Sequence, residues 1–205
     1  MKEIRFNDKV AVITGAASGI GLYASKEFVR LGARVVMCDV NEQALAAAVE
    51  EIGEAAIAVC GDVRDFGYAM SVASEAEKLG GADYLIACAG GYEARCCNSM
   101  VPFYEQPVEV IDWGLDVNLK GPVYISRALM PQMVAKKSGV LVMLGSVTGF
   151  EGDGVGAMYG TAKSGLFNFV KILMEHFRHR RTCNVSSFLW KSAFVKIAAG
   201  VLGIC

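Results

Sequence analysis

The stretch Thr14-Gly15-Ala16-Ala17-Ser18-Gly19-Ile20-Gly21 decides the fold of this 205-residue chain. It follows an apolar run at residues 10–13, typical of a buried strand, and opens residues 20–31, where apolar side chains recur at helical spacing. Glycines let the backbone turn sharply there, and a helix N-terminus offers free N–H groups and a positive dipole end. This order of elements indicates a dinucleotide-binding loop, with candidate contacts at Gly15, Ser18, Gly19, Ile20 and Gly21.

The same alternation of apolar runs and amphipathic stretches continues along the chain. Further strands are predicted at residues 34–38, 56–60, 83–88 and 140–144, and further helices at 44–52, 66–79, 108–134 and 157–177. We expect the helix at 108–134 to bend near Gly121-Pro122. Because apolar strands alternate with helices, the sequence predicts an α/β fold, a doubly wound, mostly parallel sheet with helices on both faces.

Two carboxylates stand where strands of this sheet should end. Asp39 lies 18 residues after Gly21, where it can accept hydrogen bonds from both ribose hydroxyls of an adenosine and repel a 2′-phosphate. No arginine lies in the loop or directly after Asp39, so the expected cofactor is NAD rather than NADP. Asp62 follows the third strand, where it can meet the adenine amino group. Asp39 can at the same time cap the helix that follows it, and for Asp62 capping of the next helix is an equal alternative.

Four further residues form a candidate catalytic set. Tyr159 and Lys163 are four residues apart, so they share one face of a helix. The ordinary pKa of tyrosine, about 10, is too high for a good base at neutral pH, and a nearby ammonium lowers it. Ser146, at the end of the fifth strand, can hold and polarise a substrate oxygen. Asn118 can bridge through water to Lys163 and relay protons.

These pieces together resemble a short-chain dehydrogenase/reductase of the ordinary, non-extended type, from residue 8 to about 177. The matching segments are Thr14–Gly21, Asp39, Asp62-Val63, Ala87-Cys88-Ala89-Gly90, Asn118, Ser146, Tyr159 and Lys163. The resemblance implies a Rossmann fold and a cofactor site that includes Val63, Ala89 and Gly90. It implies that Tyr159 acts as general acid and base, Lys163 holds the nicotinamide ribose, Ser146 orients the substrate and Asn118 completes a proton relay.

The function that follows is an oxidoreductase that moves a hydride between NAD(H) and a secondary alcohol or ketone. The alternative is a catalytically weak or inactive NAD-binding protein without a complete substrate pocket. The resemblance also implies a homo-oligomer, a dimer or tetramer, built on the helices at 108–134 and 157–177. The family usually has Asn-Asn-Ala-Gly where this chain has Ala87-Cys88-Ala89-Gly90, so Cys88 replaces an asparagine side chain. A role for Cys88 as a reactive thiol is an alternative.

The last 28 residues differ from the rest of the chain. Residues 1–177 carry a net charge of −6, whereas residues 178–205 carry five basic side chains and no acidic one. We therefore divide the chain into a Rossmann domain at 1–177 and an atypical tail at 178–205 that is not a separate domain. Residues 182–185 can form a degenerate sixth strand, and the substrate lid and last strand are expected to be missing or aberrant. The tail is interpreted as an out-of-frame or aberrant gene end, or as a diverged tail with an apolar helix at 188–202.

Composition excludes several other classes of function. The overall charge of −1 gives no field that attracts nucleic acid or anionic lipid. The seven cysteines include no Cys-x-x-Cys pair, and with two histidines they offer no zinc site. No Gly-x-Ser-x-Gly motif indicates a serine hydrolase. With no signal peptide or membrane-spanning run visible and the thiols expected to be reduced, we expect a soluble, cytoplasmic protein.

Overall fold

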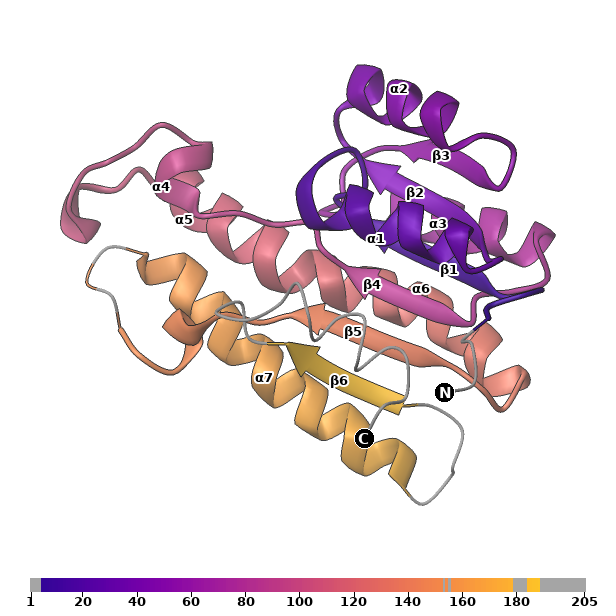
Figure 1. Cartoon of the computed structure of the whole chain (residues 1–205). Coiled ribbons are helices and arrows are strands. Elements are labelled where there is room, and N and C mark those ends of the chain that lie inside the picture. Colours follow the sequence, from indigo (N-terminus) through magenta and orange to yellow (C-terminus); the bar gives the residue numbers. More distant parts are fainter. Residues whose placement is uncertain (1–4, 153, 155, 179–183, 189–205) are drawn as a thin grey trace.

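A parallel sheet of six strands runs through the middle of the described chain (Figure 1). The structure is a computed structural model that describes residues 5–152, 154, 156–178 and 184–188. The strand order is β3-β2-β1-β4-β5-β6, and every neighbouring pair is parallel. The strands are β1 (Val10–Thr14), β2 (Arg34–Asp39), β3 (Ala56–Cys60), β4 (Tyr84–Ala87), β5 (Val140–Leu144) and β6 (Asn184–Phe188). The predicted doubly wound parallel sheet is therefore confirmed.

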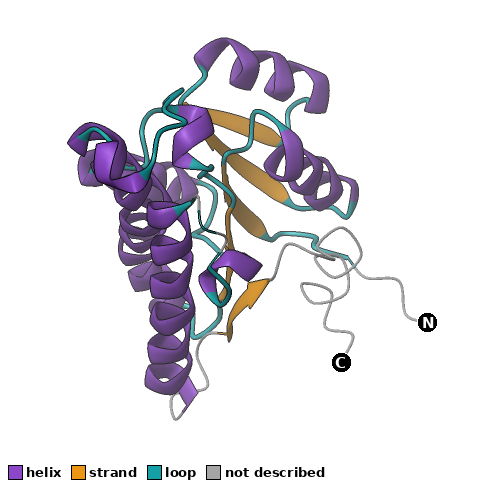
Figure 2. Cartoon of the chain, turned by 90° about the vertical axis from the view of Figure 1, so that its left-hand side faces the viewer, coloured by secondary structure: helices purple, strands orange, loops and turns teal. Residues whose placement is uncertain are grey.

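Helices cover both faces of this sheet (Figure 2). They are α1 (Gly19–Arg30), α2 (Glu42–Ile52), α3 (Phe66–Lys78), α4 (Glu93–Cys96), α5 (Val108–Leu115), α6 (Gly121–Ala135) and α7 (Ala157–Arg178), with 3-10 turns at Phe103–Glu105 and Val147–Gly149. One apolar core lies between the sheet and α1 and α2, and a second lies between the sheet and α3, α6 and α7. Burial on both faces explains why the central strands read as continuous apolar runs. Within the described ranges, no helix is both long and apolar enough to cross a membrane.

The long helix predicted at 108–134 is interrupted rather than simply bent. A π-helical turn, Asp116–Lys120, separates α5 from α6, and the N–H of Gly121 bonds to the carbonyl of Asp116, five residues back. Pro122 lies in the first turn of α6, where its missing N–H is tolerated. Single π turns inside helices are frequent at functional sites. This one carries Asn118.

A sixth strand continues the sheet close to the predicted place. We expected a degenerate strand at 182–185, and the structure has β6 two residues later, pairing Asn184 with Val140 and Phe188 with Leu144 of β5. The sheet therefore extends past residue 177, where the sequence pattern changes. The remaining interpretations of the tail, including the apolar helix at 188–202, concern residues almost all of which lie outside the described part of the chain.

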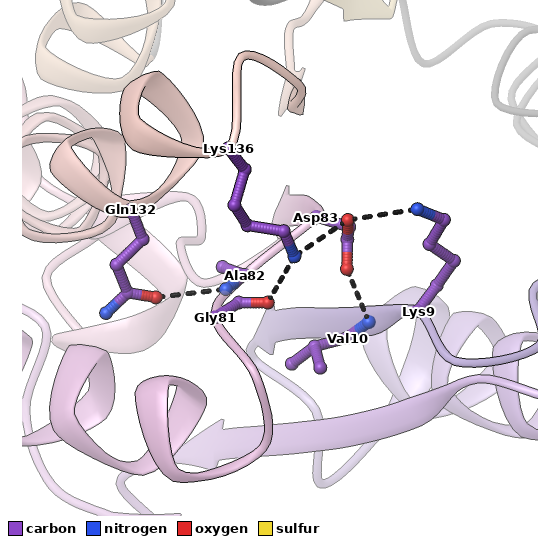
Figure 3. A network of polar contacts seen from close by, with 7 residues as sticks. All are labelled: Lys9, Val10, Gly81, Ala82, Asp83, Gln132 and Lys136. Carbon is purple, nitrogen blue, oxygen red and sulfur yellow. Dashed lines mark hydrogen bonds and ion pairs between the residues drawn. The ribbon is translucent and has the colours of Figure 1, made fainter.

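Asp83 ties the amino ends of β1 and β4 to α6 (Figure 3). One carboxylate oxygen accepts a bond from the backbone N–H of Val10 at 3.0 Å. The other lies 3.3 Å from the ammonium of Lys9 and 2.9 Å from that of Lys136. Burial alone would raise the pKa of Asp83, but Lys136, the N–H of Val10 and Lys9 together hold that pKa below its ordinary value. The sheet is thus pinned at the end opposite the strand carboxyl ends.

Candidate active site

A cavity of about 690 Å³ opens at the carboxyl ends of the strands. It lies where the strand order reverses between β1 and β4, the place where doubly wound sheets bind ligands. All the residues predicted from the sequence line it except Asn118 and Ser146. The predicted residues that line it are Gly15, Ser18, Gly19, Ile20, Gly21, Asp39, Asp62, Val63, Ala89, Gly90, Tyr159 and Lys163.

The glycine loop after β1 leaves no room for side chains at two positions. A Cβ at Gly21 would lie 2.1 Å from the carbonyl oxygen of Gly15, and one at Gly15 would lie 2.9 Å from the backbone N of Ala89. Gly19 has a φ of 52° and open space around its missing Cβ. Ser18 precedes α1 without a side-chain capping bond. The loop and the start of α1 therefore present mainly backbone atoms to the cavity.

Asp39 is held at the cavity edge by backbone groups on both sides. One oxygen accepts the N–H of Ala17 at 3.0 Å, and the other accepts the N–H of Asn41 at 3.0 Å. The cap of α2 is Asn41, whose side chain accepts the N–H of Ala44. The prediction that Asp39 also caps this helix is therefore wrong, because Asn41 takes the capping position.

Asp62 forms an ion pair that sequence reasoning missed. Its carboxylate accepts the guanidinium of Arg64 at 2.8 Å and 2.6 Å and the backbone N–H of Arg64 at 2.9 Å. The side-chain bond from Arg64 outweighs burial and lowers the pKa of Asp62. The following helix, α3, is capped by Asp65, which accepts the N–H of Gly67. Capping by Asp62 is therefore wrong as well.

Tyr159 and Lys163 line the cavity, and Ser146 lies directly behind its lining, next to Gly145. Ser146 and Lys163 are each 5% exposed. The Ser146 hydroxyl lies near enough to the Tyr159 phenol to influence its pKa, and the Lys163 ammonium lies 5.3 Å from the Tyr159 ring centroid. Lys163 also donates to the carbonyl of Leu144 at 2.8 Å. Tyr159 and Lys163 lie on one face of α7, and Lys163 reaches the carbonyl of Leu144 at the end of β5.

The pKa of Tyr159 is raised, whereas a nearby lysine ammonium was expected to lower it. Burial raises the pKa of Tyr159 above its ordinary value, the Ser146 hydroxyl lowers it, and the charge of Glu93 raises it further. Burial lowers the pKa of Lys163 to about 8, while the nearby Cys88 raises it. The protein's own groups therefore favour the protonated phenol, because burial outweighs the other influences on Tyr159.

Asn118 is completely buried and does not open into the cavity. Its amide nitrogen donates to the carbonyls of Gly91 and Gly114, both at 2.9 Å, and its oxygen accepts the N–H of Gly91 at 2.9 Å. The side chain therefore clamps the chain that follows β4 onto the π turn. Its expected part in a water relay to Lys163 stays a prediction.

Two further groups beside the cavity bear on its chemistry. Cys88 lines the cavity, and burial raises the pKa of its thiol to about 12, so the thiol stays protonated near neutral pH. This protonation disfavours the reactive-thiol alternative. Glu93, missed by sequence reasoning, is 4% exposed and accepts two backbone N–H groups at the start of α7. Its only sequence signal is an acidic residue two positions after Gly91, in the segment that follows β4.

Comparisons with known proteins identify the family of this fold. Residues 9–188 match the family model for short chain dehydrogenases. Among curated relatives, a 2-dehydro-3-deoxy-L-rhamnonate dehydrogenase (NAD(+)) of a Sphingomonas species is 35% identical over 82% of this chain and 66% of its own. A galactitol 2-dehydrogenase of Agrobacterium fabrum is 32% identical over 80% and 63%.

A solved structure of a putative short-chain alcohol dehydrogenase from Sinorhizobium meliloti matches with a TM-score of 0.79 and 29% identity. The match covers 90% of this chain and 72% of that protein. This chain spans just under two thirds of the length of the two curated relatives. The family model, these identities and the shared fold lead to one conclusion: the chain belongs to the short chain dehydrogenase family.

Proposed function

We propose that this protein is an NAD-dependent oxidoreductase that moves a hydride between NAD(H) and a secondary alcohol or its ketone. The observation that carries the proposal is that Tyr159 and the buried Lys163 line the same cavity as the glycine loop, with Ser146 next to the phenol. A carbonyl needs a proton donor at its oxygen while hydride arrives at its carbon, and these groups are suited to that task. The expected dimer or tetramer stays a prediction.

The residues present fit a dinucleotide. Close backbone packing at Gly15 and Gly21 shapes the loop, and the open space beside Gly19 leaves room for a pyrophosphate at the start of α1, whose dipole favours negative charge. Asp39 lines the cavity with its carboxylate fixed, ready to accept the ribose hydroxyls. The cations in the described cavity lining are Arg64, already paired with Asp62, and Lys163. When bound, the nicotinamide ring would supply or accept the hydride.

In this proposal the protein's own side chains manage the proton. Tyr159 donates its phenolic proton to a ketone oxygen during reduction and accepts a proton from an alcohol during oxidation. Ser146 holds the same oxygen by a hydrogen bond and polarises it. Lys163, fixed by the carbonyl of Leu144, holds the nicotinamide ribose and supplies positive charge beneath the phenol. Because burial raises the pKa of Tyr159, we expect the protein itself to favour the proton-donating role.

Binding and turnover together test this function. NADH fluorescence is titrated with the full chain, and oxidation is then measured on a panel of secondary alcohols and polyols with NAD. Saturable NADH binding with turnover of at least one substrate is the expected result. Binding without turnover would favour the alternative, a dinucleotide-binding protein without catalysis. A chain that fails to bind NADH would contradict both.

Replacing Asp39 by Asn is expected to weaken the preference for NADH over NADPH by about tenfold or more, since charge-assisted hydrogen bonds contribute about 1.5–3 kcal/mol. The loss of negative charge also removes repulsion of a 2′-phosphate. Dissociation constants for both cofactors measure the ratio. Glu42→Gln, an exposed charge three residues along, is the matched control and should leave the ratio unchanged. An unchanged ratio in Asp39→Asn would remove Asp39 from the adenosine site.

A further inference from the structure

Glu93 joins two distant parts of the chain beside the candidate active site. It begins α4, in the segment that follows β4, and its side chain is buried at 4% exposure. One carboxylate oxygen accepts the backbone N–H of Met158 at 3.0 Å, and the other accepts that of Tyr159 at 3.1 Å. A residue 66 positions earlier therefore holds the backbone of Tyr159 itself.

Helix α7 needs this support because of the way it begins. The first four N–H groups of a helix have no partner inside it, and a side chain just before the helix usually accepts one of them. The residue before Ala157 is Gly156, which has no side chain. The carbonyl of Gly156 accepts the N–H of Gly160, and Glu93 accepts the N–H groups of Met158 and Tyr159. The cap of α7 thus comes from the segment after β4.

The position of Glu93 is itself fixed by its surroundings. A Cβ at Gly114 of α5 would lie 3.3 Å from the Cβ of Glu93 and 2.6 Å from the Cβ of Met158, so α5 packs against both residues. Gly91, two residues before Glu93, is clamped by Asn118. The segment after β4, the π turn and the start of α7 therefore form one rigid unit around Tyr159.

We propose that Glu93 is a positioning residue for Tyr159: its carboxylate sets where the phenol stands against Ser146 and places a negative charge at the start of α7. The inference rests on the proposed function, in which Tyr159 handles the proton. An ordinary structural cap would contribute to stability alone. A positioning residue must also change the behaviour of the phenol.

The groups that lie around Tyr159 come from the end of β5, from α7 and from the start of α4. They are Ser146 from the end of β5, Lys163 from α7, Glu93 from α4, and Tyr92, whose ring contacts that of Tyr159 edge-on at 6.2 Å. The charge of Glu93 opposes the positive end of the α7 dipole and raises the pKa of Tyr159. Removing that charge should therefore move the phenol titration to lower pH.

The test uses Glu93→Gln and Glu93→Ala in the full chain. Gln keeps the size and one acceptor oxygen but removes the charge, whereas Ala removes both contacts. We expect turnover to fall by about a hundredfold in Glu93→Ala, since a displacement of a reacting group by about 1 Å can cost that factor in rate. In Glu93→Gln, which keeps one of the two contacts, we expect a fall of about tenfold. We expect the Tyr159 titration to move to lower pH in both. The exposed Glu105→Gln, in the same segment, is the control and should change neither readout.

The phenol titration is followed without turnover, by NMR of protein labelled at the tyrosine ring, with the Tyr159 signal assigned by its loss in Tyr159→Phe. If Glu93→Ala does not fold, Glu93→Gln decides. An unmoved Tyr159 titration in Glu93→Gln would overturn the inference, even if turnover fell, because Glu93 would then be only a helix cap. Full turnover in Tyr159→Phe would instead overturn the proposed function, so the two failures are distinguishable.

Discussion

Tyr159→Phe is expected to lower turnover by about 10³-fold while NADH binding stays within about twofold of the original chain, since positioned acid–base groups contribute about 10²–10⁴-fold. The substitution removes only the phenolic oxygen, which lies next to Ser146. The ring remains to pack edge-on against Tyr92, and the contacts of α7 with Glu93 use the backbone. Steady-state oxidation of a secondary alcohol and NADH fluorescence titration measure the two quantities.

The control for this substitution is Tyr104→Phe, because Tyr104 is 82% exposed and lies outside the cavity lining. It should retain turnover. A Tyr159→Phe protein that keeps more than about a tenth of the original rate would remove Tyr159 from the acid–base role. Loss of both turnover and NADH binding would point to a disturbed cofactor site instead.

Asp83→Ala is expected to lower the free energy of unfolding by about 2–3 kcal/mol. The change leaves the N–H of Val10 without its carboxylate partner inside the sheet and removes the anchor shared by Lys9 and Lys136. Both lysine side chains are partly exposed, so they can turn to water, which keeps the loss below that of a fully buried ion pair. Urea unfolding measures the difference.

The contribution of Asp83 should also depend on pH. Its pKa in the folded protein is held below the unfolded value of about 3.9, so the stabilisation is present above that pH and is lost as pH falls through the folded pKa. The stability gap between the original chain and Asp83→Asn should therefore be full at pH 5–8 and narrow below about pH 4. Asp112→Asn, at an exposed position, should show no such gap. A gap that stays constant down to pH 2 would contradict the assignment.

Local sequence patterns predicted most of the strands and helices. The ranges of β3 and β5 agree with the structure residue for residue. The apolar run of β5 lies between Gly139 and Gly145, which mark both of its ends. The helical spacing of Tyr159 and Lys163 predicted their meeting, since residues four apart share a face. These predictions need only the residues next to each position in the sequence and one rule, that the carboxyl ends of parallel strands lie at the same edge of the sheet. The strand β6 is the exception.

The features that sequence reasoning missed depend on contacts between distant residues. Nothing near Glu93 indicates that its carboxylate reaches α7, 65 residues later. The pairing of Arg64 with Asp62 and the capping of α2 by Asn41 rather than Asp39 depend on side-chain directions. The π turn could not be predicted without knowing that the Asn118 side chain bonds to the backbone of Gly91. A one-dimensional pattern cannot rank such choices, because several local arrangements satisfy it equally well.

The position of β1 between β2 and β4 affects how the sheet can form while the chain is being synthesised. β1 pairs with β2 on one side and with β4 on the other, and Val10 meets Asp83 across 73 residues. During synthesis, one edge of the first strand stays unpaired until β4 has emerged, several seconds after β2 at about 5–20 residues per second. An open apolar edge is a template for association with other chains. Until β4 has emerged, we infer, the growing polypeptide depends on chaperones or on its own first helices for protection.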